Sequence, residues 1–332
     1  MRGRWLILPL ALAVGLAAAA GAAEPRKVKV GVLKLSSSAP VFIGVEKGFF
    51  RETGVEPELI YFQAAQPVAV AIAAGDIEVG ATGLTAGLYN IVAGGEKLWV
   101  VADKGREWPG FPLTGLVVQK DGPIHSVKDL RGKKVGITQL GSTFHYMLGN
   151  LVEQEGLSLA DVEPAPLRTL GAMAEALQAR RVDAILIPQP LAGTTVEKGF
   201  GRVLHWVGDR LTSYQVAAIF ASNRFVQDRE RAVAFLKGYV RASRYYHDAV
   251  IAHKGGAQYD EVVAITARYT EAPPDAIRVG FPYQDRDARL DLQDIAKQLS
   301  WYHRAGMITR SLSPRDLVDT SLLDEALRAL PR

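Results

Sequence analysis

The chain repeats one α/β pattern at a spacing of 105 residues, and this repeat restricts the possible folds more than any other feature. The stretch Lys29-Val-Gly-Val returns as Lys134-Val-Gly-Ile, and each copy is followed by small and hydroxyl residues. At the same spacing, the alanine-rich residues 68–74 correspond to residues 173–179. Two matches in one register indicate two similar units in one chain.

Each unit alternates strands with amphipathic helices, which predicts parallel sheets. The expected strands of the two units are residues 28–33, 58–62, 134–138 and 164–169. Two further apolar strands are expected at residues 116–119 and 216–221, and helices at residues 229–252, 259–269 and 290–305. We expect those helices to cover the first unit. The predicted fold is α/β, with two doubly wound lobes joined by two hinge crossings that face a cleft.

The first residues have the pattern of a secretory signal peptide. Arg2 and Arg4 precede an apolar run that is too short to span a membrane, and small residues follow at 17–23. We therefore predict a signal peptide at residues 1–23, lobe I at 24–115 and 222–332, and lobe II at 116–221. Export would place the mature protein in the periplasm.

Composition argues against several classes of partner. The formal net charge is +4 and the basic residues are mixed with acidic ones, which favours a soluble protein over one that binds nucleic acid. The chain has no cysteine, so it has neither disulfides nor a cysteine for a lipid anchor. We expect a monomer.

Candidate ligand contacts follow the strands, where loops lead into helix N-termini that attract anions. The two hydroxyl-rich loops of the repeat would face each other across the cleft, and further loops would line its rim. Arg106 offers a bidentate partner for a carboxylate or sulfonate, and Trp108 an apolar wall. The candidate ligand-binding residues are Ser36, Ser37, Ser38, Thr82, Gly83, Thr85, Arg106, Trp108, Gly141, Ser142, Thr143 and Gln189.

No catalytic, metal or cofactor motif is visible. The six histidines are dispersed, with no His-x-x-x-His pair, and the chain lacks Walker A, Gly-x-Ser-x-Gly and dinucleotide motifs in the required setting. His145 has no evident catalytic partner by sequence. We therefore predict a non-enzymatic protein with no metal and no cofactor.

Several segments resemble a known family in order and spacing. Residues 39–50 (Ala-Pro-Val-Phe-Ile-Gly-Val-Glu-Lys-Gly-Phe-Phe), with residues 74–80, 127–136, 181–184 and 316–323, resemble the taurine, alkanesulfonate, nitrate and thiamine-pyrimidine binding proteins. Residues 103–112, which are rich in turn formers and which we expect to form a loop at the first crossing between the lobes, match no single subfamily. The resemblance implies a type II periplasmic-binding fold, a small organic anion as ligand, and delivery of that ligand to an ABC permease.

Two other functions fit the same pattern. A periplasmic sensor would use the same lobes to dock onto a membrane kinase or chemoreceptor. An enzyme similar to thiamine-pyrimidine synthases would share the fold, but those proteins have a cysteine-rich segment that this chain lacks. We rank transport first.

Overall fold

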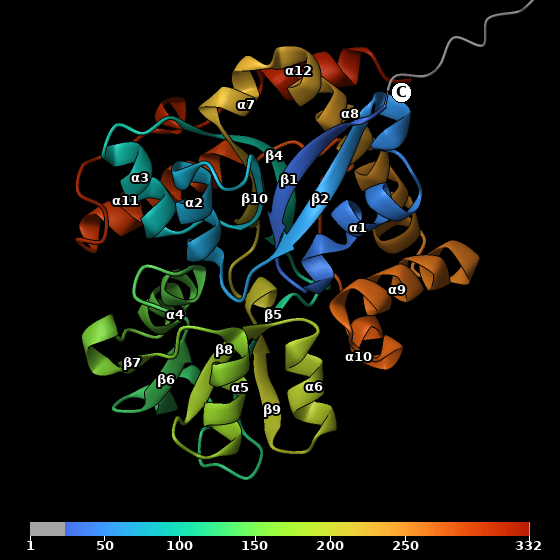
Figure 1. The fold of residues 1–332 in the computed structure, drawn as a ribbon. Helices are drawn as coiled ribbons and strands as arrows, with labels where there is room; N and C mark the ends of the chain where they lie inside the picture. The colour runs from blue at the N-terminus through green and yellow to red at the C-terminus, as the bar shows by residue number, and fades with distance from the viewer. Residues whose placement is uncertain (1–23, 332) are drawn as a thin grey trace, which may run out of the picture.

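The computed structural model describes residues 24–331, so the predicted signal peptide lies outside the described residues. Among residues 24–331, no helix is both long and apolar enough to cross a membrane. Figure 1 shows two α/β lobes, one above the other, each built around its own sheet. The predicted fold class is confirmed.

The first sheet has the strand order β2-β1-β3-β10-β4. Strands β1, β2 and β3 run parallel, whereas β10 lies antiparallel between β3 and β4. Its strands are β1 (Arg26–Val32), β2 (Val55–Tyr61), β3 (Val79–Gly83), β4 (Leu98–Glu107) and β10 (Tyr214–Ser222). In β1, Val28, Val30 and Val32 are fully buried, as expected for a sheet covered by helices.

The second sheet repeats this arrangement, with the order β7-β6-β8-β5-β9. Strands β6, β7 and β8 run parallel, and β5 lies antiparallel between β8 and β9. Its strands are β5 (Thr114–Gln119), β6 (Lys134–Ile137), β7 (Glu163–Pro166), β8 (Ala184–Pro188) and β9 (Gly201–Trp206).

The predicted repeat is confirmed by the helices as well as by the strands. Helices α2 (Ala65–Ala74) and α3 (Ala86–Ala93) of the first unit correspond to α5 (Leu170–Gln178) and α6 (Leu191–Glu197) of the second. Helix α1 (Ala39–Glu46) corresponds to α4 (Thr143–Gln154). In each case the two helices begin 104 or 105 residues apart.

The chain crosses between the sheets twice, once from β4 to β5 and once from β9 to β10. Residues 103–112, expected to form a hinge loop, begin as strand, because β4 continues to Glu107 and pairs with β10. The charged residues favoured a loop in the sequence, but Asp103, Lys104 and Glu107 are buried within the strand. Burial raises the pKa of Glu107 to about 8.

The pairing of β10 also bears on the predicted lobe boundary. Residues 214–221 were assigned to lobe II, but hydrogen bonding places β10 in the first sheet. The return crossing therefore lies between Trp206 and Tyr214. The remaining lobe limits stay a prediction.

The C-terminal helices pack mainly on the first lobe. Helix α8 (Arg229–Tyr246) contacts α1 and α12 (Ser321–Arg328), and α9 (Gly256–Thr270) contacts α1. Two helices also reach the second lobe: α10 (Pro274–Arg278) contacts α6, and α11 (Leu292–Arg304) contacts α4. The short α7 (Asn223–Gln227) follows β10. The helices thus cover the first lobe as predicted, and two of them also touch the second.

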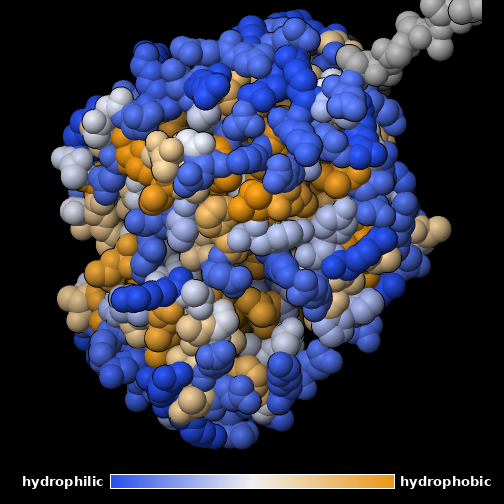
Figure 2. Space-filling model, viewed as in Figure 1, coloured by the Kyte–Doolittle hydropathy of each residue, from blue (hydrophilic) through white to orange (hydrophobic). Residues whose placement is uncertain are grey.

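The lobes are in contact with each other. One cluster of buried apolar residues includes Leu84 from the first unit and Phe144 from the second. In Figure 2, hydrophobic residues on the visible face concentrate in a band across the middle, while hydrophilic residues cover the top and bottom. The two lobes therefore lie in a closed arrangement.

We predict that Gly149→Ala destabilises the protein by about 1–3 kcal/mol, since overpacking a tight contact costs energy of that order. A Cβ at Gly149 would overlap the ring of Trp301, which joins α4 to α11. Urea unfolding would measure the change. Gly171→Ala on α5 is the control, because its Cβ meets no atom within 4 Å. Equal destabilisation by both changes would contradict the tight α4–α11 packing.

Candidate ligand-binding site

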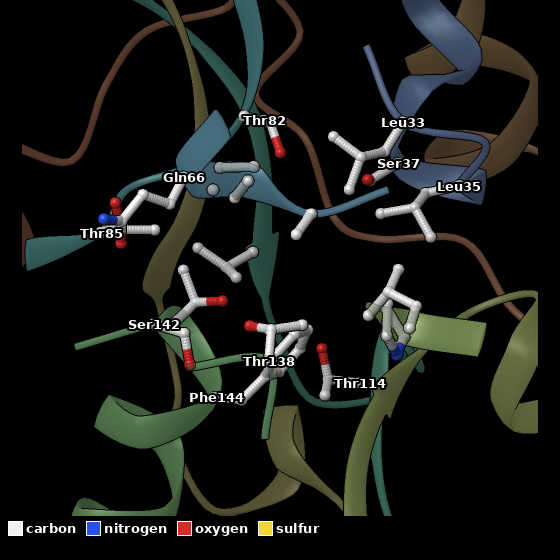
Figure 3. A pocket seen from close by; sticks show the side chains of 18 of the residues that line it. Leu33, Leu35, Ser37, Gln66, Thr82, Thr85, Thr114, Thr138, Ser142 and Phe144 are labelled. Atoms are coloured by element: carbon white, nitrogen blue, oxygen red, sulfur yellow. The ribbon is translucent and has the colours of Figure 1, made fainter. Parts of the chain in front are cut away.

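A cavity of about 50 Å³ lies between the lobes, where the loops after the strands face each other. Figure 3 shows Leu33, Ser37 and Thr82 above it, and Thr114, Thr138 and Ser142 below it. It is lined by Leu33, Leu35, Ser37, Ala64, Ala65, Gln66, Thr82, Gly83, Thr85, Lys104, Leu113, Thr114, Thr138, Gln139, Ser142, Thr143, Phe144, Leu170, Pro188, Val216 and Ala217. Hydroxyl groups and apolar side chains dominate this lining.

The structure brings six of the predicted site residues together in this lining: Ser37, Thr82, Gly83, Thr85, Ser142 and Thr143. They come from both lobes, and Gly83 lies against the methyl group of Thr143. The paired placement expected from the repeat therefore exists. Their role in binding stays a prediction.

Two helices begin at the cavity. Thr85 caps α3 and accepts a bond from the Leu88 N–H (3.2 Å), and Ser142 caps α4 and accepts from the His145 N–H (3.2 Å). Each hydroxyl keeps its own proton for a ligand oxygen. The positive ends of both helix dipoles also favour an anion at this place.

Within residues 24–331, the only lysine or arginine that lines the cavity is Lys104, which was not among the candidates chosen from the sequence. Its side chain is 1% exposed, and its Nζ donates to the Oγ of Ser37 (2.9 Å). Burial lowers the pKa of Lys104 to about 7, although the neighbouring Asp103 carboxylate acts in the opposite direction. An anion in the cavity would find both a cation and several hydroxyl donors.

A β-bulge directs Lys104 to this position. Asp103 and Gly105 face the consecutive residues Ala218 and Ala217 of β10, so Lys104 is the extra residue of the pairing. Gly105 follows with a φ of 148°, a conformation that favours glycine. The glycine after a charged pair, at the end of an apolar strand, is the sequence signal that could have revealed the bulge.

The carboxylate beside the bulge is held by neighbouring donors. Asp103 accepts bonds from the backbone of Gly105 (2.8 Å) and Asp285 (2.8 Å) and from the Gln215 amide (2.6 Å). Burial raises the pKa of Asp103, and the Arg106 guanidinium opposes that shift. Asp103 thus anchors β4 to β10 and to the loop before α11.

Arg106 and Trp108 do not line the cavity, contrary to the expected placement. The Arg106 guanidinium lies near Asp103 (Nε to Oδ2, 3.6 Å) and donates to the backbone carbonyl of Arg289. Trp108 stacks on Tyr283, with 4.7 Å between ring centroids. Both side chains pack against the segment before α11 because β4 continues as a strand where a loop was expected.

Four other candidates, Ser36, Ser38, Gly141 and Gln189, are not among the residues that line the cavity. Ser36 donates its N–H to the Gln189 carbonyl (3.2 Å), and Gln189 Oε1 accepts from the Gly193 N–H (3.1 Å). Ser38 Oγ donates to the Leu33 carbonyl (2.9 Å). The Gly141 carbonyl accepts from the Ala86 N–H (2.9 Å) of the opposite lobe. The Ser36–Gln189 and Ala86–Gly141 backbone bonds join the two lobes, whereas the other two bonds lie within one lobe.

His145 adds no positive charge to the site. Its Nδ1 accepts a bond from the Gly141 N–H (3.0 Å), and burial lowers its pKa to about 4. The ring is therefore neutral at neutral pH. Within residues 24–331, no cluster of three or more histidine, aspartate and glutamate side chains could hold a metal ion.

The closed cavity is small, since sites for small molecules usually measure about 300–1,000 Å³. The lobes must therefore separate before a ligand enters. The connections at residues 107–114 and 206–214 are the two places where the chain passes between the sheets. Motion of the lobes about these connections would open the cavity.

The sequence is similar to a known protein family and to two named bacterial proteins. A family model described as the NMT1-like family matches residues 21–257. A protein of Escherichia coli that carries the name of an aliphatic sulfonates-binding protein is 29% identical over 60% of this chain. The match spans 61% of that protein, less than two thirds of its length. A Bacillus subtilis protein of the same name is 22% identical over 91% of this chain and 88% of its own length.

Solved structures share the fold over nearly the whole chain. The alkanesulfonate-binding protein SsuA from Xanthomonas axonopodis pv. citri has a TM-score of 0.73 and 20% identity, covering 90% of this chain and 99% of its own. The nitrate-binding protein NrtA from Synechocystis has a TM-score of 0.76 and 16% identity, covering 92% and 89%. The desulfurization enzyme DSZB, at 0.68 and 17%, covers 92% and 99%.

We predict that Lys104→Met stabilises the unliganded protein. The pKa of Lys104 is about 7 in the folded state and near 10.5 when unfolded, so the unfolded chain binds more protons between these values. Stability from this group therefore rises with pH across that window, and the cost of burying the charge is greatest below pH 7. The variant should exceed wild type by about 2–4 kcal/mol at pH 6, and by less at pH 9.

Urea unfolding at both pH values would measure this difference, with Lys120→Met, an exposed lysine, as the control. An advantage of Lys104→Met that is equal at both pH values would contradict the titration of a buried ammonium group.

Proposed function

We propose that this chain, which belongs to the NMT1-like family, is the substrate-binding protein of an ABC importer and encloses a small organic anion between its lobes. The observation that carries the proposal is the buried ammonium of Lys104, surrounded by hydroxyl groups and two helix N-termini in the interlobe cavity. Such a set of donors suits the several oxygens of a sulfonate or carboxylate head group. Aliphatic sulfonates are the first candidates, because both curated relatives are named for binding them.

The remaining parts of the proposal concern location and partners. The predicted signal peptide at residues 1–23 supports export to the periplasm, where a monomer would deliver its ligand to the permease subunits. A sensor that docks onto a membrane kinase would use the same cavity. A permease and an ATPase gene beside this one would favour transport, and a kinase gene would favour sensing.

Binding without catalysis is also part of the proposal. The likeness to a desulfurization enzyme is at 17% identity and concerns the fold alone. In the cavity, Ser37 Oγ lies 2.9 Å from Lys104 Nζ, which is the geometry of a serine with a neighbouring base. We assign this pair to ligand binding, because Lys104 Nζ donates to Ser37 Oγ and the other protons of the ammonium group are available to an anion.

A thermal-shift screen of the protein without residues 1–23 would test the function, since a ligand that binds the native state raises its apparent stability. We expect a shift with alkanesulfonates, and the ligand should be recovered unchanged. Lys104→Met should weaken binding by on the order of 30- to 1,000-fold, because it leaves the buried anion without its cation. Lys120→Met should bind as wild type does. A chemically altered ligand would contradict binding without catalysis.

The affinity for the anion should depend on pH. A bound anion favours the charged form of Lys104 and raises its pKa above the value of about 7 in the empty site. Binding above pH 7 must therefore take up a proton, and the affinity should fall by up to about tenfold per pH unit between pH 7 and 9. Calorimetry in two buffers of different ionisation enthalpy would measure the proton uptake. A pH-independent affinity would place the anion away from Lys104.

A further inference from the structure

A second and larger groove lies beside the ligand cavity. Its volume is about 500 Å³, and it shares two lining residues with the inner cavity, Leu33 and Leu170. Leu33 follows β1 in the first lobe, whereas Leu170 begins α5 in the second. One leucine from each lobe therefore borders both spaces, and we call this pair, Leu33 and Leu170, the neck.

The walls of this outer groove combine apolar side chains with polar and charged ones. Tyr61 ends β2 and Phe62 follows it on one side, and Pro190 and Leu191 lie at the start of α6 on the other. Tyr61 is 40% exposed, so part of its ring is open to an occupant of the groove. Aromatic side chains in such a place offer flat surfaces for an apolar group.

The charges around the groove do not call for a charged occupant. Lys34 pairs with Glu271 (2.5 Å), and its ammonium also lies over the Tyr61 ring, 5.4 Å from the centroid. On the opposite wall, Glu197 and Lys198 are adjacent, exposed and of opposite sign. The two lysines and two glutamates that line the groove therefore balance in charge.

We propose that the groove is a subsite for the tail of the ligand, and that the ligand is an organic anion with an extended apolar tail that ends in an aromatic ring. This inference rests on the proposed function. The inner cavity is too small for more than a head group, so a longer ligand leaves through the neck and lies on Tyr61 and Leu191. A head group alone would leave the groove empty.

The position of the neck links binding of the tail to closure of the lobes. Because Leu33 and Leu170 belong to different lobes, the neck widens when the lobes separate and narrows when they close. The tail would be clamped between the two leucines in the closed state. Tail length and closure are then coupled, and a compound with a bulky branch next to its head group would hold the lobes apart.

Calorimetry with three sulfonates tests the subsite: methanesulfonate, butane-1-sulfonate and 4-phenylbutane-1-sulfonate. We expect the affinity to rise by about two- to fourfold for each added methylene, and further with the phenyl group. Tyr61→Ala and Leu191→Ala, from opposite walls, should each weaken the phenyl compound by about five- to tenfold and change methanesulfonate by less than about twofold. Val196→Ala, an exposed residue of α6 outside the groove, is the control.

The possible outcomes separate this inference from the proposed function. Equal affinity for all three sulfonates, or a phenyl gain that survives both groove variants, would overturn the tail subsite and leave the anion site intact. Binding of none of the three would overturn the sulfonate proposal and this inference with it. A gain with length that is lost in Tyr61→Ala and Leu191→Ala but retained in Val196→Ala would establish the subsite.

Discussion

The antiparallel pairing of β10 between β3 and β4 is the constraint on which the rest of the structure depends. It returns the chain from the second sheet to the first, so the two lobes are held by two connections instead of one. It also creates the β-bulge that places Lys104 at the cavity. Asp103, on the other side of the bulge, is bound by Gln215 of β10. The architecture and the site therefore share one set of hydrogen bonds.

The burial of Lys104 opposes stability and supports binding. A buried ammonium group loses its hydration, which explains the lowered pKa, and the Ser37 hydroxyl replaces only part of the lost water. An anion would supply the missing partner. The open and closed states of the lobes then differ in their electrostatics, because the closed state without ligand keeps the Lys104 ammonium group in a small buried space. Closure around an anion is thereby favoured over closure around water.

Much of the fold could be predicted from the sequence, because the repeat at 105 residues reflects two copies of one packing pattern. The hydroxyl loops at Ser37 and Ser142 followed from the same reasoning, since strand ends and helix N-termini meet at one edge of a sheet. Lys104 could not be found in this way. A charged run usually indicates a loop, and only the partner strand reveals that Asp103, Lys104 and Glu107 are buried. Arg106 and Trp108 were misplaced for the same reason.

The second sheet has a further consequence, which concerns how such proteins could diversify. All five of its strands lie in one uninterrupted stretch, from Thr114 to Trp206, and the two ends of that stretch lie side by side because Gly115 pairs with Trp206. The first sheet takes strands from both sides of it. One half of the cavity, with Ser142, Thr143 and Leu170, is therefore encoded by a single contiguous piece of gene. Exchange of the gene segment that encodes residues 114–206 between related genes would replace one wall of the site and leave Lys104 in place.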